Sequence, residues 1–135
     1  MVADLNNDGK QDLVVANNAD PPAILINQLP DAGSFLRVVL VGDSRHNRDP
    51  VGARVRVVAR GDDGPIAMTR WLEIGSGYCG QSDTRLHFGL GAASEISSIE
   101  VTWPDGELDT FEGEDVRNLI DREIRIRQEA GVIDA

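Results

Sequence analysis

Apolar residues at every second position are the feature that most constrains the fold of this chain. The stretch 51–60 places valine and alanine on one face and arginine on the other. "IEVTW" at 99–103 and "REIRIRQ" at 122–128 alternate in the same way. Because successive side chains of an extended strand point to opposite faces, this period predicts β-strands with one buried face.

Other runs and turn signals extend the all-β pattern. "FLRVVLVG" at 35–42 is almost continuously apolar and predicts a central strand, and "IAMTRWLEI" at 66–74 predicts another. "GDDGP" at 61–65 and "PDG" at 104–106 are turn signals that would join hairpins. Only 114–121 predicts a short helical turn, favoured by acidic residues at its start. We therefore expect an antiparallel β-sandwich or a partly open barrel.

Composition narrows the classes of partner. The formal net charge is −10, from 23 acidic and 13 basic residues, in a chain of 135 residues that suffices for one domain. A nucleic acid is not an expected partner, because cations supply the affinity for phosphates. No apolar run approaches the length of a membrane span, so membrane insertion is not expected either. The single cysteine, Cys79, excludes an intrachain disulfide.

The opening stretch "DLNNDGKQD" places oxygen-bearing side chains at alternate positions around Gly9. Ca²⁺ takes about six to eight hard oxygen ligands, and short loops supply them with this spacing. The predicted ligands are the side chains of Asp4, Asn6, Asp8 and Asp12, with the carbonyl of Lys10. The loop is not an EF-hand, since Val15 stands where that motif needs glutamate. The alternative interpretation is an Asx-rich turn without metal, and a loop near a chain end is expected to be poorly preorganised.

The loop and the segments after it resemble one repeat of FG-GAP and VCBS-type proteins. In those repeats D-x-[DN]-x-D-G-x-x-D loops bind calcium between strands of a β-propeller blade, and here "DLVVAN" and "AILIN" match the two strands. The resemblance covers about residues 4–28. One blade cannot close a propeller, because blades bury their faces on their neighbours. Residues 1–28 are therefore expected to be a leftover half-blade of a longer chain, with the upstream blades as its partner.

The rest of the chain carries four motifs that resemble the ASPIC/UnbV domain over about residues 35–129. They are "SRHNRDPVGARV" at 44–55, the loop "GSGYCGQS" at 75–82, the turn "HFGLG" at 87–91 and the hairpin "VTWPDG" at 101–106. The family typically places this domain directly after FG-GAP repeats. The resemblance implies a non-catalytic, calcium-associated interaction or adhesion module in an extracellular or cell-envelope protein. The N-terminus of this chain lacks the apolar core of a signal peptide.

Enzymatic interpretations have little support in the sequence. "GSGYCG" at 75–80 matches G-x-G-x-x-G, but a dinucleotide site needs a helix next, and "QSDTRLHFGLG" has no helical period. His46 and His87 form no metal-spaced cluster, and Ser76 lies outside a G-x-S-x-G elbow. We find no positive evidence for an enzyme.

The motif loops carry polar and amphipathic side chains that predict a recognition patch for a protein or a glycan. They are Arg48, Asp49, Tyr78, Gln81, Ser82 and His87. The alternative interpretation is that these side chains only form structural hydrogen bonds with the buried backbone of their loops. Glycines expected to have positive φ are Gly52, Gly89, Gly91 and Gly106, and expected core residues are Phe88, Leu90, Val101 and Trp103.

Two further functions stay open at this point. One is an accessory domain of an enzyme that binds carbohydrate near Tyr78 or Trp71. The other is a structural cap on the propeller, which predicts an exposed apolar face and hence dimerisation or aggregation.

Overall fold

The chain is almost entirely β-structure. The computed structural model describes residues 1–43, 47–62, 64–75, 77–78 and 80–134. The strands are β1 (Val2–Ala3), β2 (Asp12–Val15), β3 (Ala23–Leu25), β4 (Ser34–Val41), β5 (Arg54–Gly61), β6 (Gly64–Trp71), β7 (Leu86–Gly91), β8 (Glu95–Thr102), β9 (Leu108–Glu112), β10 (Arg122–Arg127) and β11 (Gly131–Asp134). A short helix, α1 (Glu114–Arg117), confirms the helical turn expected there. His46, Ser76 and Cys79 lie outside the described residues.

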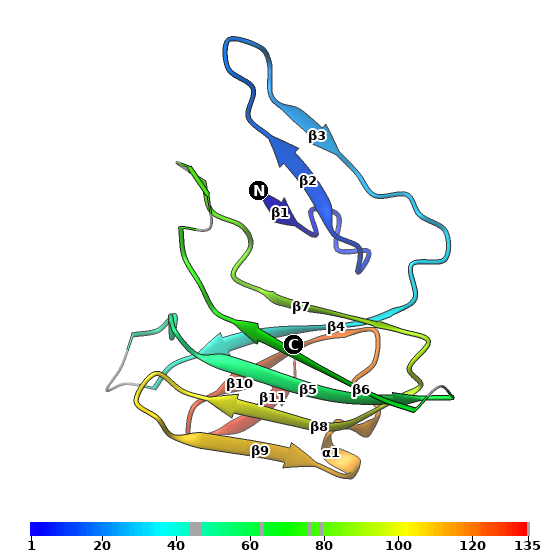
Figure 1. Ribbon diagram of the computed structural model, residues 1–135. Helices are drawn as coiled ribbons and strands as arrows, with labels where there is room; N and C mark the ends of the chain where they lie inside the picture. The colour runs from blue at the N-terminus through cyan, green and yellow to red at the C-terminus, as the bar shows by residue number, and fades with distance from the viewer. Residues whose placement is uncertain (44–46, 63, 76, 79, 135) are drawn as a thin grey trace.

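Two four-stranded sheets pack face to face and confirm the expected sandwich (Figure 1). Their strand orders are β11-β10-β4-β7 and β6-β5-β8-β9. Alternate residues of β5 and β8 point inward, so the period of two in the sequence corresponds to one buried face per strand. The four expected core residues, Phe88, Leu90, Val101 and Trp103, are all buried in one hydrophobic cluster.

Strand β4 is central in its sheet, as its continuous apolar run predicts. It pairs with β7 in antiparallel fashion but with β10 in parallel, whereas the sequence analysis expected antiparallel strands. Between β4 and β10 the chain forms the whole second sheet and then returns. Such a long crossover is what a parallel pair requires.

The turn predictions are confirmed in most places. The 61–65 segment joins β5 to β6, and 104–106 joins β8 to β9. Positive φ is found at three of the four expected glycines, Gly52, Gly91 and Gly106. The prediction for Gly89 was wrong, because this residue lies within β7 and pairs with Phe35. "HFGLG" is therefore a strand and not a turn, and its alternate buried positions point into the core.

The first three strands form a separate antiparallel sheet, β1-β2-β3. Figure 1 shows this sheet in blue, standing beside the sandwich rather than extending it. The expected strands after the loop are both present, and the two-residue β1 adds a third that the sequence analysis did not predict. Within the described residues no helix is long and apolar enough to span a membrane.

Candidate functional site

The loop between β1 and β2 is closed by the carboxylate of Asp4. This side chain is 1% exposed. Its Oδ1 accepts a hydrogen bond from the backbone N–H of Asp8 at 3.1 Å, and its Oδ2 accepts one from Gly9 at 2.8 Å. The first residue of the predicted calcium loop therefore fixes the turn in the middle of the loop.

Asp12 joins the end of the loop to its start and to the strand that follows. It is also 1% exposed. Its Oδ2 accepts the N–H of Leu5 and its Oδ1 accepts the N–H of Asn27, each at 2.8 Å. Among the described residues, no ion pair reaches Asp12. This buried carboxylate is thus held by backbone dipoles alone, although a buried charge ordinarily needs a cation.

Asp8, Asn6 and Lys10 form the exposed side of the loop. Asp8 Oδ1 accepts the backbone N–H of Lys10 at 2.9 Å. Its Oδ2 lies 3.1 Å from Lys10 Nζ and accepts the side-chain amide of Asn6 at 3.0 Å. The bonds from the Lys10 amide and from Asn6 hold the pKa of Asp8 below its ordinary value. Asp8 is accordingly an anion at neutral pH.

Gly9 meets two requirements at the turn of the loop. Its φ is +85°, a conformation that L side chains rarely adopt. A Cβ at this position would also lie 2.2 Å from Cε1 of Phe35 in β4. The Phe35 ring stacks on His87 at 6.0 Å between centroids, and Arg37 Cζ lies 5.6 Å from its centroid. The loop is therefore seated on an aromatic side chain of the sandwich.

Arg37, in the central strand β4, reaches out of the sandwich into the loop. It is buried, and its Nη1 forms an ion pair with Asp4. The same nitrogen lies 3.3 Å from Asn7 Oδ1, and Nε lies 3.2 Å from Glu123 Oε2 in β10. One guanidinium thus joins the loop to two strands of the sandwich.

Arg85, immediately before β7, completes what we call the arginine clamp, namely Arg37 with Arg85. Its Nη2 donates to the carbonyl of Asp4 at 2.8 Å, and its Nη1 donates to Asn7 Oδ1 at 2.8 Å. The Nε of Arg85 donates a hydrogen bond to Asp83 Oδ2 at 2.6 Å. The clamp was not predicted from the sequence. A signal existed, because Arg37 is the one charge within the apolar 35–42 run.

The chain terminus is also tied down, contrary to the expectation of a poorly preorganised loop. The N-terminal ammonium donates to the carbonyl of Val14 at 2.9 Å. The N–H of Asp83 donates to the carbonyl of Val2 at 3.1 Å, and the N–H of Val2 donates to Ser82 Oγ at 3.2 Å. The loop is therefore fixed from the sandwich side and from the terminal side.

The oxygen atoms of the loop are of the types that bind Ca²⁺. They are carboxylate, amide and carbonyl oxygens, which this hard cation prefers. In the part of the chain that is described, no three His, Cys, Asp or Glu side chains converge as a metal site. Lys10 and Arg37 instead place cationic groups on Asp8 and Asp4. Asp12 is the buried loop carboxylate without a cationic partner among the described residues, so it is the one whose charge Ca²⁺ would compensate.

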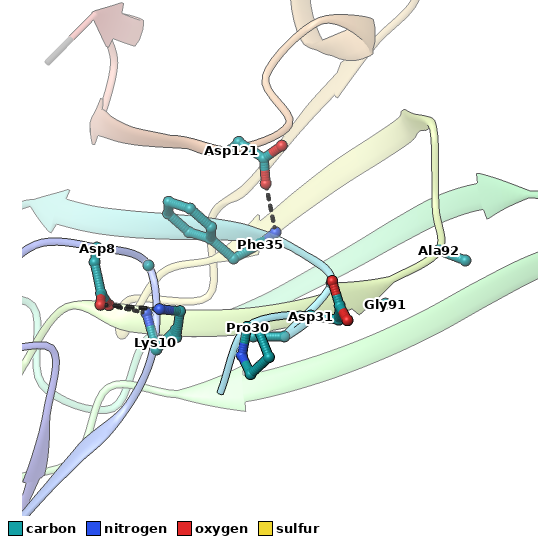
Figure 2. A pocket seen from close by; sticks show the side chains of 11 residues that line it. Asp8, Lys10, Pro30, Asp31, Phe35, Gly91, Ala92 and Asp121 are labelled. Carbon is teal, nitrogen blue, oxygen red and sulfur yellow. Dashed lines mark hydrogen bonds and ion pairs between the residues drawn. The ribbon is translucent and has the colours of Figure 1, made fainter. Parts of the chain in front are cut away.

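A groove of about 750 Å³ runs between the loop and the segment before β4 (Figure 2). Asp8, Lys10 and Asp121 are among the residues that line it. Asp121 Oδ1 accepts the N–H of Phe35 at 3.0 Å, and Asp8 is paired with Lys10, as the dashed lines in Figure 2 show. These two carboxylates therefore already serve local structure.

The six predicted recognition residues do not form one patch. Tyr78 is fully exposed, and with Gln81 and Ser82 it lines a hollow of about 490 Å³ beside β2. Ser82 also lines a second cavity together with His87. The last two residues, Arg48 and Asp49, lie between β4 and β5. No hydrogen bond or ion pair among the described residues joins either of them to the other four.

His87 lies between the loop and the second cavity. Burial of the imidazole lowers the pKa of His87, and the charges of Arg37 and Arg70 act in the same direction against the opposing charge of Asp4. Its Nδ1 is buried and has no hydrogen-bond partner among the described residues. His87 is therefore a neutral side chain at neutral pH with an unsatisfied nitrogen.

Comparison with known proteins supports the resemblance found in the sequence. The model of the family described as "ASPIC and UnbV" matches residues 42–132. Cartilage acidic protein 1 of Mus musculus and that of Homo sapiens are each 33% identical over 111 residues, and that of Xenopus tropicalis is 32% identical over 112 residues. These alignments cover 80% or 81% of this chain but 16% of each relative. No solved structure matches. The chain belongs to the ASPIC and UnbV family.

Proposed function

We propose that this chain is a non-catalytic interaction module of an extracellular or cell-envelope protein, in which residues 1–28 complete a β-propeller built by other blades of the same protein. The apolar face of the β1-β2-β3 sheet carries this proposal. It is supported by the family of the sandwich and by the small share of the relatives that the chain spans. A protein or a glycan is the partner that we propose for the assembled module.

An apolar row crosses all three strands of that sheet. Val2 pairs with Leu13, and Leu13 pairs with Leu25, so the three side chains lie on one face. Their exposed fractions are 39%, 45% and 56%. A contiguous exposed apolar surface on a soluble domain marks a contact site. A propeller blade has such a face because it packs against the neighbouring blade.

The double substitution Leu13→Lys with Leu25→Lys tests this face. We expect the unmodified chain to self-associate in sedimentation experiments at high concentration and the double variant to be monomeric. The matched control is Leu108→Lys, an equally apolar and exposed position on β9 of the sandwich. A chain that is monomeric without substitution, and that binds no hydrophobic dye at this sheet, would contradict the proposal.

We also propose that the loop 4–12 binds Ca²⁺. The ligands would be the side chains of Asp4, Asn6, Asp8 and Asp12 and the carbonyl of Lys10. Three observations support this: the oxygen donor set, the ionised Asp8, and the burial of Asp12 without a cation. Bound calcium would neutralise the buried carboxylate of Asp12 and stiffen the loop itself.

Calorimetric titration of the chelated protein with calcium is the test, with Asp8→Ala as the variant. We expect saturable binding that Asp8→Ala abolishes. Asp31→Ala serves as the control, because Asp31 lies outside the loop but lines the adjoining groove. Binding that is absent in the unmodified chain, or equal in the two variants, would show that the loop is an Asx-rich turn and not a metal site.

A structural cap is the second candidate, and the arginine clamp favours it. The clamp fastens the first sheet to the sandwich, so the sandwich would cover one end of the propeller rigidly. The two candidates differ in the fate of a longer chain that includes upstream blades. A cap predicts loss of propeller stability when the sandwich is removed, whereas an interaction module predicts a stable propeller that has lost its partner.

A further inference from the structure

We propose that a cavity between β6, β7 and the loop 4–12 binds a neutral sugar ring, such as the terminal pyranose of a glycan. The residues that carry the proposal are Trp71, Arg70, Glu73, Gln11 and His87, all of which line this cavity. The proposal does not depend on calcium binding or on the propeller.

The cavity lies where one edge strand of each sheet meets the other. Strand β6 ends one sheet, β7 ends the other, and Val2 of β1 and Gln11 of the loop 4–12 close the third side. The volume is about 290 Å³. This is at the lower limit of small-molecule sites, which suits a single ring rather than a long oligosaccharide.

Part of the lining of the cavity is apolar. Trp71 is 53% exposed at the end of β6, whereas the other tryptophan, Trp103, is buried and donates its indole N–H to Asp109 at 2.8 Å. Leu72 and Leu86 are buried and also line the cavity. The C–H face of a pyranose packs well on an exposed aromatic ring of this kind, since an aromatic side chain supplies a large apolar surface with one polar edge.

The rim supplies donors and acceptors without net charge. Among the described residues, Arg70 donates only to the carbonyl of Thr69 at 3.2 Å, and neither Arg70 nor Glu73 has an ion-pair partner there. The remaining charges at the rim, Asp83 and Arg85, are already paired with each other at 2.6 Å. The guanidinium of Arg70, the carboxylate of Glu73 and the amide of Gln11 suit hydroxyl groups, which both donate and accept hydrogen bonds.

His87 also lines the cavity, and its ring has a fixed orientation. Its ring is fixed by stacking on Phe35, and its buried Nδ1 has no partner in the described part of the chain. Tyr78, the other exposed aromatic residue, lines a different hollow, so Trp71 is the aromatic residue that has these polar groups around it.

Nuclear magnetic resonance of the full chain tests the proposal through the indole N–H signals of its two tryptophans. The probes are methyl α-mannopyranoside, methyl β-glucopyranoside, methyl β-galactopyranoside and N-acetylglucosamine, each titrated to about 50 mM because single rings bind weakly. We expect at least one probe to shift the Trp71 signal saturably and to leave the Trp103 signal unchanged. No saturable shift with any of the four would overturn the proposal.

Three variants locate the site. Trp71→Ala and Glu73→Ala should each weaken binding by about tenfold or more, read from backbone signals around the cavity. Tyr78→Ala, which removes an exposed aromatic side chain outside the cavity, should bind as the unmodified chain does. An unchanged Trp103 signal verifies that each variant is folded. Equal affinity in Trp71→Ala and the unmodified chain would refute the assignment.

Two further controls separate the sugar from other ligands. Methyl β-glucuronide and inorganic phosphate should bind no better than the neutral probes, and preferential binding of either would overturn the claim of a neutral ligand. Titration in excess calcium and in chelator should give saturable binding in both. A site that exists only with calcium would refute the independence claimed here, while the calcium proposal itself is judged by calorimetry.

Discussion

Replacing Arg37 by methionine is expected to release the loop 4–12 from the sandwich. Methionine keeps an unbranched apolar stem in the strand but removes the charge that faces Asp4. Both partners of this ion pair are buried, and Asp4 is 1% exposed. Removing one partner of a buried pair costs about 3–5 kcal/mol, because the other charge is left uncompensated.

The loss should be local rather than global. Asp4 escapes the penalty if the loop separates from the sandwich and its carboxylate is hydrated, and neither Asp4 nor Arg37 belongs to the core cluster of the sandwich. We therefore expect about 3 kcal/mol to be lost from docking, which corresponds to about a hundredfold change in the opening equilibrium. The sandwich itself should unfold in urea close to its original midpoint.

Hydrogen exchange measures this opening. The N–H of Gly9 donates to Asp4 Oδ2, so its exchange should accelerate by about a hundredfold in Arg37→Met, while the N–H of Val57 in β5 should be unaffected. The control is Arg56→Met, which removes a largely exposed arginine paired with Glu100 at 3.3 Å and should cost less than about 1 kcal/mol. An unchanged Gly9 exchange rate in Arg37→Met would refute the clamp.

Two other predictions follow from the same region. Gly9→Ala should destabilise the loop 4–12 more than Gly52→Ala destabilises its own turn. Both glycines have positive φ, which costs about 1–2 kcal/mol for alanine. Of the two, only Gly9 has a neighbour, the Phe35 ring, that the new Cβ would strike. Hydrogen exchange of the two segments checks this, and equal effects would contradict it. Because the pKa of His87 is lowered in the folded state, the unfolded state binds the proton more tightly, and the free energy of unfolding should fall as pH drops below the ordinary value of 6.5. Urea midpoints at about pH 7.5 and about pH 5.5 should differ less in His87→Gln than in the unmodified chain, and an equal difference in both would contradict the assignment.

The strands that the sequence predicts are those whose pattern of buried and exposed residues can be read from one short segment. In the segment 51–60 one face is buried and the other is solvated, so the alternation of valine with arginine encodes β5. The prediction of a turn at 87–91 was wrong because Gly89 and Gly91 interrupt the strand pattern of β7, although its apolar residues are buried. The parallel pairing of β4 with β10 joins residues that are 86 positions apart, such as Leu36 and Arg122, and no local period carries that information.

The candidate site shows the same division between local and distant causes. The spacing from Asp4 to Asp12 and the position of Gly9 are local, and the structure forms the turn that they predict. What holds the turn comes from Arg37, which is 33 residues from Asp4, and from Arg85, which is 81 residues away. A charge in an otherwise apolar central strand is nevertheless a local sign of a distant partner, because such a charge is rarely buried unpaired. It follows that the loop and the sandwich are energetically linked. Any cation that binds Asp4 competes with Arg37 for the same carboxylate. Metal binding at the loop would therefore alter the contact between the first sheet and the sandwich.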